Sequence, residues 1–439
     1  MLINILGGGL AGSEAAYFLA KKGYQVNLYE MKPDKFSPAH TNANLGELVG
    51  SNSLKSISLA SGHGLLKEEM RLFGSLILEA ADYSSVPAGQ ALAVDRDIFA
   101  EYITTKLKET EGISINNNEI TDIKPFLMNN EHITVIATGP LTSEPLFYSL
   151  REIFGEQSLH FFDAAAPIVS AESLDMDKLF FQTRYDKGEP DYLNSAMDQN
   201  LYYSFVDELI KAEKSVPRDF EEKMLFEGCM PVESIALRGR ETLAFGTMKP
   251  VGIVDPVTGV TPYAVVQLRA ENRERTMYNL VGFQTKLKWA EQKRVFSMIP
   301  GLENAEFLRY GVIHKNIFFN SPKILDPQTI SANNLSNIYF AGQITGVEGY
   351  CESSASGIYT AYAIDKRIKG ECVYLPEDTM MGALQRYTVT ENKNYQPMAS
   401  NFGLLTGKID VPRKIKGSDK KKFISEQALI SMKKFINAD

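Results

Sequence analysis

Residues 2–30 read LINILGGGLAGSEAAYFLAKKGYQVNLYE, and this stretch specifies the architecture of the chain. Leu2–Leu6 is apolar and predicts a buried parallel strand, Ser13–Lys22 predicts a helix, and Gln25–Tyr29 predicts a second strand. The turn between the first strand and the helix matches G-x-G-x-x-G, with glycines at positions 7, 9 and 12. Because strand, glycine turn, helix and strand follow in that order, the segment predicts a βαβ unit of the Rossmann type.

The glycine turn also predicts a ligand. Gly7 permits the tight turn, Gly9 lets the backbone approach a pyrophosphate, and Gly12 lets the helix lie close to the strand. The anion would sit at the helix N-terminus, where unpaired N–H groups and the helix dipole favour negative charge. Glu30 ends the second strand and is placed to accept a hydrogen bond from a ribose hydroxyl. The sequence therefore predicts a dinucleotide site.

Composition indicates a large globular protein. The chain has 439 residues, 44% hydrophobic and 23% charged, which suggests two or three domains with ordinary cores. We find no apolar run of about 20 residues, and the first helix carries Glu14 and no basic leader precedes it, so neither a membrane span nor a signal peptide is expected. Three cysteines without metal-site spacing favour a reducing cytoplasm. A net charge of −8 argues against indiscriminate nucleic-acid binding, but a local patch could still bind RNA.

The chain divides into three parts. Ile133–Gly139 and Ile338–Gly342 each predict a strand that runs into a glycine turn, far from the first turn. A nucleotide domain assembled from both ends of the chain explains this pattern. The region between the two ends differs in its residue pattern, since it contains charged helical stretches (Phe205–Lys214, Phe220–Phe226) and β-like runs (Ala264–Leu268, Tyr278–Phe283). We predict an α/β fold: a first part of the nucleotide domain (residues 1–165), an inserted α+β substrate domain (166–311) and the second part of the nucleotide domain with a basic C-terminal tail (312–439).

Four further segments carry expectations. Thr41–Gly64 is rich in Ser, Asn and Gly and is either a functional loop or a stretch that contains short helices. Ala91–Lys108 and Ser354–Ile368 show helical periodicity. The C-terminal segment has a net charge of +6, which favours a solvated tail at least as much as an RNA contact; its basic residues are Arg413, Lys414, Lys416, Lys420, Lys421, Lys422, Lys433 and Lys434.

Blocks spread along the chain resemble one enzyme family. They include GGGLAGSEAA, ELVGSNSL, FEGCMPVE, TMKPVGI, VGFQTKLKW, YGVIHKN, YFAGQITGVEGY and NFGLL. Together they resemble the folate- and flavin-dependent tRNA uracil-5-methyltransferases (TrmFO), relatives of the GidA-type flavoproteins, from Leu2 to about Leu405. The resemblance implies a glutathione-reductase-like FAD domain with an inserted domain. It also implies reduction of the flavin by NADPH or NADH, 5,10-methylenetetrahydrofolate as one-carbon donor, and 5-methyluridine in the tRNA T loop as product.

The resemblance also assigns cofactor contacts. The ADP half of FAD would lie against the first glycine turn and Glu30, Thr138 and Gly139 would add backbone contacts, and the segment after the last strand would approach the flavin. The residues concerned are Gly7, Gly9, Leu10, Ala11, Gly12, Glu30, Thr138, Gly139, Gly342, Gln343 and Ile344.

Methylation of uracil at C5 needs a nucleophile and a base. A thiolate that adds at C6 makes C5 nucleophilic, and a base later removes the C5 proton. Cys229 matches the family nucleophile, although a cysteine after glycine is by itself more often a packing residue. The family's second cysteine falls at Gly50, which has no side chain and cannot carry a proton. Cys351 is a possible substitute, but a small buried residue near the cofactor is the stronger interpretation; Cys372 is expected to be an ordinary strand residue.

Two further positions concern the substrates. Lys286 occupies a place where family members often have a histidine that stacks on the folate pterin, and a lysine cannot stack in that manner. Arg238, in Arg238-Gly239-Arg240, is a phosphate contact or, with equal weight, part of a surface salt bridge.

Three functions are therefore compared. The first is an RNA uracil methyltransferase acting on the tRNA T loop, favoured by Cys229 and the basic C-terminus. The second is a diverged paralogue that acts as a flavin-dependent methylenetetrahydrofolate/NAD(P)H oxidoreductase without tRNA methylation, or that methylates ribosomal RNA, favoured by Gly50. A flavin-bound binding protein without turnover is the weakest of the three. Reduced folate, NAD(P)H and RNA are the expected partners, and no membrane is expected.

Overall fold

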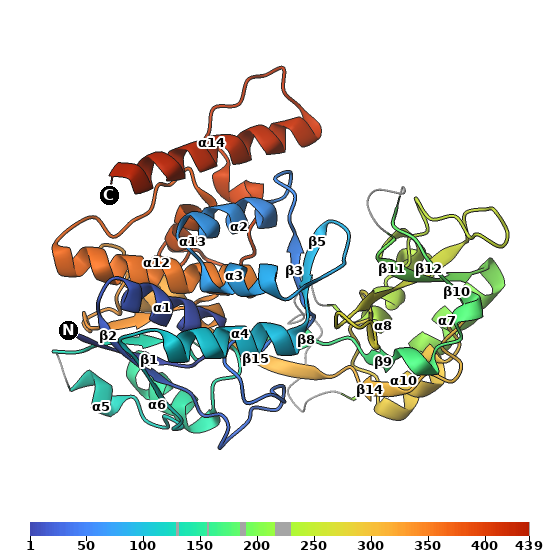
Figure 1. Cartoon of the computed structure of the whole chain (residues 1–439), viewed down its shortest axis with the longest axis horizontal. Helices are drawn as coiled ribbons and strands as arrows, with labels where there is room; N and C mark the ends of the chain where they lie inside the picture. The colour runs from blue at the N-terminus through green and yellow to red at the C-terminus, as the bar shows by residue number, and fades with distance from the viewer. Residues whose placement is uncertain (129–130, 156–157, 185–189, 216–229, 439) are drawn as a thin grey trace.

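The computed structural model describes residues 1–128, 131–155, 158–184, 190–215 and 230–438. Two bodies are visible in Figure 1, a larger one on the left that contains both termini and a smaller one on the right. Among the residues described, no helix is long and apolar enough to cross a membrane.

A five-stranded parallel sheet forms the centre of the larger body. Its strand order is β16-β7-β1-β2-β6, so the first strand of the chain lies between β2, which follows it directly, and β7, which comes from much further along the chain. The strands are short and apolar because both faces of a parallel sheet are covered by helices. They are β1 (Leu2–Leu6), β2 (Gln25–Tyr29), β6 (Ile113–Asn116), β7 (Ile133–Ile136) and β16 (Ile338–Phe340).

Helices from both ends of the chain cover this sheet. Helix α1 (Leu10–Lys21) packs along α12 (Tyr350–Lys369), and a Cβ atom added at Gly357 would lie 2.2 Å from the Ala11 carbonyl oxygen. Glycine at that position therefore allows the two helices to touch. The other helices of this body are α2 (Gly62–Leu72), α3 (Leu76–Tyr83), α4 (Arg96–Glu109), α5 (Lys124–Leu127), α6 (Glu144–Phe154), α11 (Ser321–Ile324), α13 (Met380–Tyr387) and α14 (Gly417–Ala438).

The smaller body is built on an antiparallel six-stranded sheet. The order is β10-β11-β12-β13-β9-β14, and all six strands lie between residues 168 and 309. One face packs on helices through a core that includes Phe205, Phe283 and Phe296. Its elements are β9 (Ile168–Ser170), β10 (Leu179–Phe181), β11 (Tyr192–Met197), α7 (Gln199–Lys211), α8 (Val232–Leu237), α9 (Thr242–Phe245), β12 (Ala264–Ala270), β13 (Met277–Leu280), α10 (Trp289–Phe296) and β14 (Phe307–Arg309). The structure thus separates the two sheets along the chain as the domain prediction expects, but the domain limits at 165 and 311 stay a prediction.

Two strands carry the chain between the bodies. Strand β8 (Ser158–Ala164) pairs antiparallel with β15 (Ile313–Phe319), from Ile313 opposite Ala164 to Phe319 opposite Ser158. A separate small sheet, β3-β5-β4, lies on the side of the larger body that faces the smaller one (Figure 1); its strands are β3 (Ser53–Ser56), β4 (Ser85–Val86) and β5 (Ala91–Val94).

Several local predictions differ from the structure. Ala91–Lys108 is a strand followed by a helix, because Asp95 caps α4 by accepting from the Asp97 and Ile98 N–H groups. Cys372 lies in an exposed loop and not in a strand. The C-terminal segment is not a solvated tail, since residues 417–438 form helix α14. The predicted helix Phe220–Phe226 lies outside the described residues.

Candidate functional site

The first glycine turn fits its predicted roles atom by atom. A Cβ atom at Gly12 would lie 1.8 Å from the Gly7 carbonyl oxygen, and one at Gly7 would lie 2.5 Å from that of Ala137. Gly7 also has a φ of +104°, which L side chains rarely adopt. A Cβ atom at Gly9, in contrast, would have no heavy atom within 4 Å. Gly9 therefore faces open space, as a backbone position that a pyrophosphate approaches must do.

A cavity opens from this turn along the carboxyl edge of the parallel sheet. This is the edge at which open α/β sheets bind ligands. It collects predicted residues from four separate segments: Gly7, Gly9, Leu10, Ala11, Glu30, Thr138, Gly139, Gly342 and Gln343. Gly12 and Ile344 do not line it; Gly12 packs against Gly7, and the Ile344 side chain is 1% exposed in the core.

Glu30 has protein partners in addition to any ligand. Its Oε2 accepts from the Gly8 N–H at 2.9 Å and its Oε1 from the Lys32 N–H at 3.1 Å. A carboxylate has further lone pairs, so a ribose hydroxyl can still donate to it. The acid thus also fixes the glycine turn to the end of β2.

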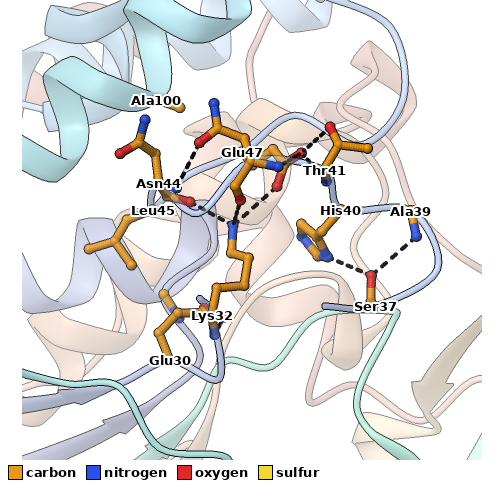
Figure 2. Close-up of polar contacts among 12 residues, drawn as sticks. Glu30, Lys32, Ser37, Ala39, His40, Thr41, Asn44, Leu45, Glu47 and Ala100 are labelled. Carbon is orange, nitrogen blue, oxygen red and sulfur yellow. Dashed lines mark hydrogen bonds and ion pairs between the residues drawn. The ribbon is translucent and has the colours of Figure 1, made fainter. Parts of the chain in front are cut away.

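Another part of the cavity wall was not predicted from the sequence. It contains a buried ion pair between Lys32 and Glu47. The Lys32 ammonium donates to Glu47 Oε2 at 3.1 Å and to the Asn42 and Asn44 carbonyl oxygens at 3.0 and 2.6 Å (Figure 2). Its three hydrogens are therefore all used, and the two side chains are only 3% and 8% exposed. The segment 41–47 therefore surrounds the Lys32 ammonium, and these contacts stabilise its conformation.

The same wall contains a histidine. His40 lines the cavity, and its Nδ1 lies 2.5 Å from Ser37 Oγ, which itself accepts from the Ala39 N–H (Figure 2). Burial, followed by the nearby Lys32 charge, lowers the pKa of His40. A neutral ring is therefore favoured at neutral pH. No local pattern in the sequence marks Lys32, His40 or Glu47 as a group, because they meet only when segment 41–47 folds back.

The loop that contains Gly50 is held by distant side chains. Arg96 donates to the Leu48 and Gly50 carbonyl oxygens at 2.8 and 2.5 Å, and Arg309 donates to the Val49 carbonyl oxygen at 2.9 Å. Arg96 also pairs with Glu271 at 2.6 Å. Because Arg309 and Glu271 belong to the smaller body, this loop connects the two bodies.

Tyr350 occupies the space beside Gly50. The Gly50 N–H donates to the Tyr350 hydroxyl at 2.7 Å, and a Cβ atom at Gly50 would lie 2.8 Å from that oxygen. The Gly50 φ lies outside the left-handed region, so the backbone itself accepts a side chain. Burial raises the pKa of Tyr350, so its hydroxyl is protonated at neutral pH. Any residue larger than glycine at position 50 must displace this ring.

Two of the three cysteines were considered for the chemistry. Cys229 lies outside the described residues. Cys351 is 3% exposed at the start of α12, and burial raises the pKa of its thiol to about 11. A neutral, buried thiol is a poor base, which agrees with the packing interpretation of Cys351. In the described part of the chain, no group of three or more His, Cys, Asp or Glu side chains could hold a metal ion.

The two predicted substrate residues lie in the smaller body. Lys286 is 2% exposed, and its N–H donates to Glu233 Oε1 at 2.7 Å, while Thr285 donates to Oε2 at 2.9 Å. Arg238 is exposed at the end of α8. Its neighbour Arg240 pairs with Asp207 at 2.7 Å and lies 4.2 Å from the Tyr203 ring centroid, so the surface salt-bridge interpretation applies to Arg240.

The parallel sheet, the glycine turn and the cavity together define a dinucleotide-binding protein of the Rossmann type. A solved structure of Aquifex aeolicus GidA has the same fold, with a TM-score of 0.70 and 16% identity; the match covers 99% of this chain and 72% of that one. The predicted fold class is therefore confirmed.

The comparisons identify the family. The family model of glucose inhibited division protein A, GidA, matches residues 2–372. The methylenetetrahydrofolate–tRNA-(uracil-5-)-methyltransferase TrmFO of Fusobacterium nucleatum is 51% identical over 99% of this chain and 98% of its own length. The TrmFO proteins of Acetivibrio thermocellus and Bacillus subtilis are 53% and 52% identical, over 98% and 94% of this chain and 97% and 93% of their own. The chain belongs to the GidA family and, within it, to the TrmFO group.

Proposed function

We propose that this protein is an FAD-dependent enzyme that uses 5,10-methylenetetrahydrofolate and NAD(P)H to methylate C5 of a uridine in tRNA. The observation that carries the proposal is the identity of about half of all residues to TrmFO proteins over nearly the whole chain, with the glycine turn and its cavity intact. The relatives' names specify folate, tRNA and uracil C5. We place the T loop as the target and the cytoplasm as the location on the resemblance alone.

The cavity residues fit the proposed cofactor. With FAD bound, the open space at Gly9 would hold the pyrophosphate beside Leu10 and Ala11 at the start of α1, where a helix N-terminus favours an anion, and Glu30 would accept from the adenosine ribose. Thr138, Gly139, Gly342 and Gln343 form the continuation of the cavity toward Tyr350. When bound, the flavin supplies the two-electron chemistry that links reduced nicotinamide to the folate one-carbon unit.

The uracil chemistry requires a nucleophile and a base. We assign the nucleophile to Cys229, from the resemblance, and place the base near the Gly50 loop, which Arg96 and Arg309 hold at the junction of the two bodies. Neither Gly50 nor the buried Cys351 thiol supplies a base. The exposed Arg238 is proposed to contact folate or RNA from the smaller body, whereas Lys286, which is 2% exposed, is buried in this structure and would have to become accessible to make such a contact.

The alternative is a diverged paralogue with only the folate and flavin chemistry, or with ribosomal RNA as its substrate. One observation favours it: the Tyr350 hydroxyl lies 2.8 Å from where a Cβ atom at position 50 would be, so it occupies the space of the side chain that the family places there. The two functions predict different products from the same mixture.

The test incubates the purified protein with FAD, methylenetetrahydrofolate labelled in its one-carbon unit, and either NADPH or NADH. A tRNA transcript, a ribosomal RNA transcript or no RNA is then added. Labelled 5-methyluridine in tRNA supports the proposal, and label in ribosomal RNA alone supports the alternative target. Oxidation of NAD(P)H that depends on folate and leaves both RNAs unlabelled would replace the proposal by the redox paralogue. A Cys229→Ala variant should lose methylation but keep reduction of the flavin by NAD(P)H.

A further inference from the structure

The basic C-terminal segment is an anchored helix. Ile424, Ala428 and Met432 recur every four residues along α14 and are 8%, 0% and 0% exposed. This stripe packs on α2, and Ser425 Oγ donates to the Leu59 carbonyl oxygen at 2.7 Å. The helix spans roughly 33 Å, at about 1.5 Å per residue. It is therefore a rigid element whose outer surface has a fixed place on the larger body (Figure 1).

The cations of this segment are all exposed, three of them just before α14 and five on it, and we call this set the basic face. It consists of Arg413, Lys414, Lys416, Lys420, Lys421, Lys422, Lys433 and Lys434, all of them exposed. Within the described ranges, none of the eight forms an ion pair. Their charges are therefore available to a partner.

The three lysines near the start of α14 do not stabilise the helix. Lys420, Lys421 and Lys422 lie near its N-terminus, where the dipole is positive, and its last turn contains no basic residue. Cations are favourable at the opposite end, by about 0.3–1 kcal/mol each. Three adjacent lysines also repel one another. Folding of the helix thus gives no reason for these three lysines.

The charge of the basic face is opposite to that of the remaining chain. Residues 413–434 carry +6, with only Asp419 and Glu426 opposing eight cations, while the whole chain carries −8. The other residues therefore sum to −14. A protein of that charge repels RNA except where a local cationic surface attracts it.

We propose that the basic face of α14 binds backbone phosphates of the tRNA substrate, outside the loop that is methylated. The proposal rests on the proposed function, because it assigns the substrate of that function to a surface. Leu59, which α14 contacts, follows the Gly50 loop by nine residues in the chain. A folded RNA held on α14 therefore lies on the body that presents this loop. Phosphate contacts of this kind supply affinity and carry no sequence information.

The test compares two triple variants of the FAD-loaded enzyme. Lys420→Gln/Lys421→Gln/Lys422→Gln removes three cations of the basic face. Lys106→Gln/Lys124→Gln/Lys178→Gln removes three lysines, two of them exposed and Lys106 partly exposed, that pair with Glu79, Glu152 and Glu303 elsewhere. Both variants have the same change in net charge. The measurements are the Kd and KM for tRNA at several salt concentrations, with NAD(P)H-dependent flavin reduction in the absence of RNA as the basal activity.

The basic-face variant should raise the Kd and KM for tRNA about tenfold or more. It should also flatten the dependence of log Kd on log salt by about 0.7–0.9 for each phosphate that the protein no longer neutralises. Its kcat at saturating tRNA and its flavin reduction should equal those of the wild type. The control variant should bind tRNA as the wild type does.

Equal effects of the two variants would overturn the proposal, since net charge and not this surface would then govern binding. Unchanged tRNA binding by the basic-face variant, with methylation intact, would overturn it and leave the proposed function standing. Binding of this face to anionic phospholipid vesicles without any effect on tRNA would assign the surface to a different partner and would also overturn it.

Discussion

Two glycine-containing segments border the same cavity and are held in opposite ways. The turn Gly7–Gly12 is fixed by neighbouring backbone, with Gly12 against Gly7 and Gly7 against Ala137. The loop Leu48–Gly50 is fixed by the long side chains of Arg96, Arg309 and Tyr350, which come from three distant segments. A close-packed turn needs glycine at set spacings and leaves a motif in the sequence. A loop held by side chains leaves none, because its partners are set by tertiary structure.

The largest effect is expected in the first glycine turn, where Gly12 serves packing and Gly9 serves the approach of the ligand. Gly12→Ala places a Cβ atom 1.8 Å from a carbonyl oxygen and should lower the free energy of unfolding by at least about 3 kcal/mol, at the upper end of overpacking costs. Gly9→Ala meets no atom and should leave stability unchanged while weakening FAD binding. Denaturant titration and FAD fluorescence measure the two effects. Wild-type FAD affinity in Gly9→Ala would show that no ligand approaches this atom.

The next effect concerns the side chains that hold the second segment. Arg96→Met leaves Glu271, which is 2% exposed, without its counter-ion and should cost about 3–5 kcal/mol. Arg96→Met/Glu271→Met should recover part of the loss, because no buried charge then stands alone. Lys178→Met, from the exposed pair with Glu303, serves as control and should cost under about 1 kcal/mol. A similar loss in the single and double variants would mean that the carbonyl contacts, and not the ion pair, stabilise the loop.

Lys32 offers a comparison between the cavity wall and the surface. Lys32→Met removes three hydrogen bonds from a charged donor to segment 41–47, and each such bond contributes about 1.5–3 kcal/mol to the fold of that segment. Because this segment forms part of the cavity wall, FAD binding should weaken about tenfold or more. Lys32→Arg should restore part of the affinity. Lys408→Met, which breaks the exposed pair with Glu377 away from the cavity, should leave it almost unchanged. Equal FAD affinity in Lys32→Met and Lys408→Met would show that segment 41–47 keeps its fold without the buried pair.

The next prediction concerns the contact between position 50 and the Tyr350 hydroxyl. Gly50→Cys is allowed by the backbone but must displace the Tyr350 hydroxyl 2.8 Å away, so we expect a loss of about 1–3 kcal/mol. Tyr350→Phe removes that oxygen. Gly50→Cys should therefore lower the free energy of unfolding less in the Tyr350→Phe background than in the wild type. Tyr350→Phe alone should lose only the hydrogen bond from the Gly50 N–H. A double-mutant cycle measured by denaturation reports the coupling, and tRNA methylation by Gly50→Cys tests whether the cysteine supplies a base. Robust methylation by the unmodified protein would show that another group serves as base.

The last effect is a dependence of the free energy of unfolding on pH. Burial raises the pKa of Glu348 to about 8, with a further contribution from Asp163. The folded state thus holds a proton that the unfolded state releases above its ordinary pKa of 4.5, so the free energy of unfolding falls as pH rises from about 4.5 to 8. In flavin-free protein, Glu348→Gln should reduce this slope by up to about 1.4 kcal/mol per pH unit, whereas Glu101→Gln, at an exposed position, should leave it unchanged. An unaltered slope in Glu348→Gln would assign the pH dependence to other groups.

Local patterns in the chain were enough to predict the βαβ unit, the glycine turn and the strands before Gly139 and Gly342, because buried parallel strands and glycine-dependent turns are encoded by neighbouring residues. The motifs were also enough to predict the family. The folded chain alone shows that Lys32 pairs with Glu47, that Tyr350 fills the space beside Gly50, and that α14 exposes its lysines on an anchored helix. Each of these depends on contacts between segments far apart in the chain, and no spacing of residues encodes them.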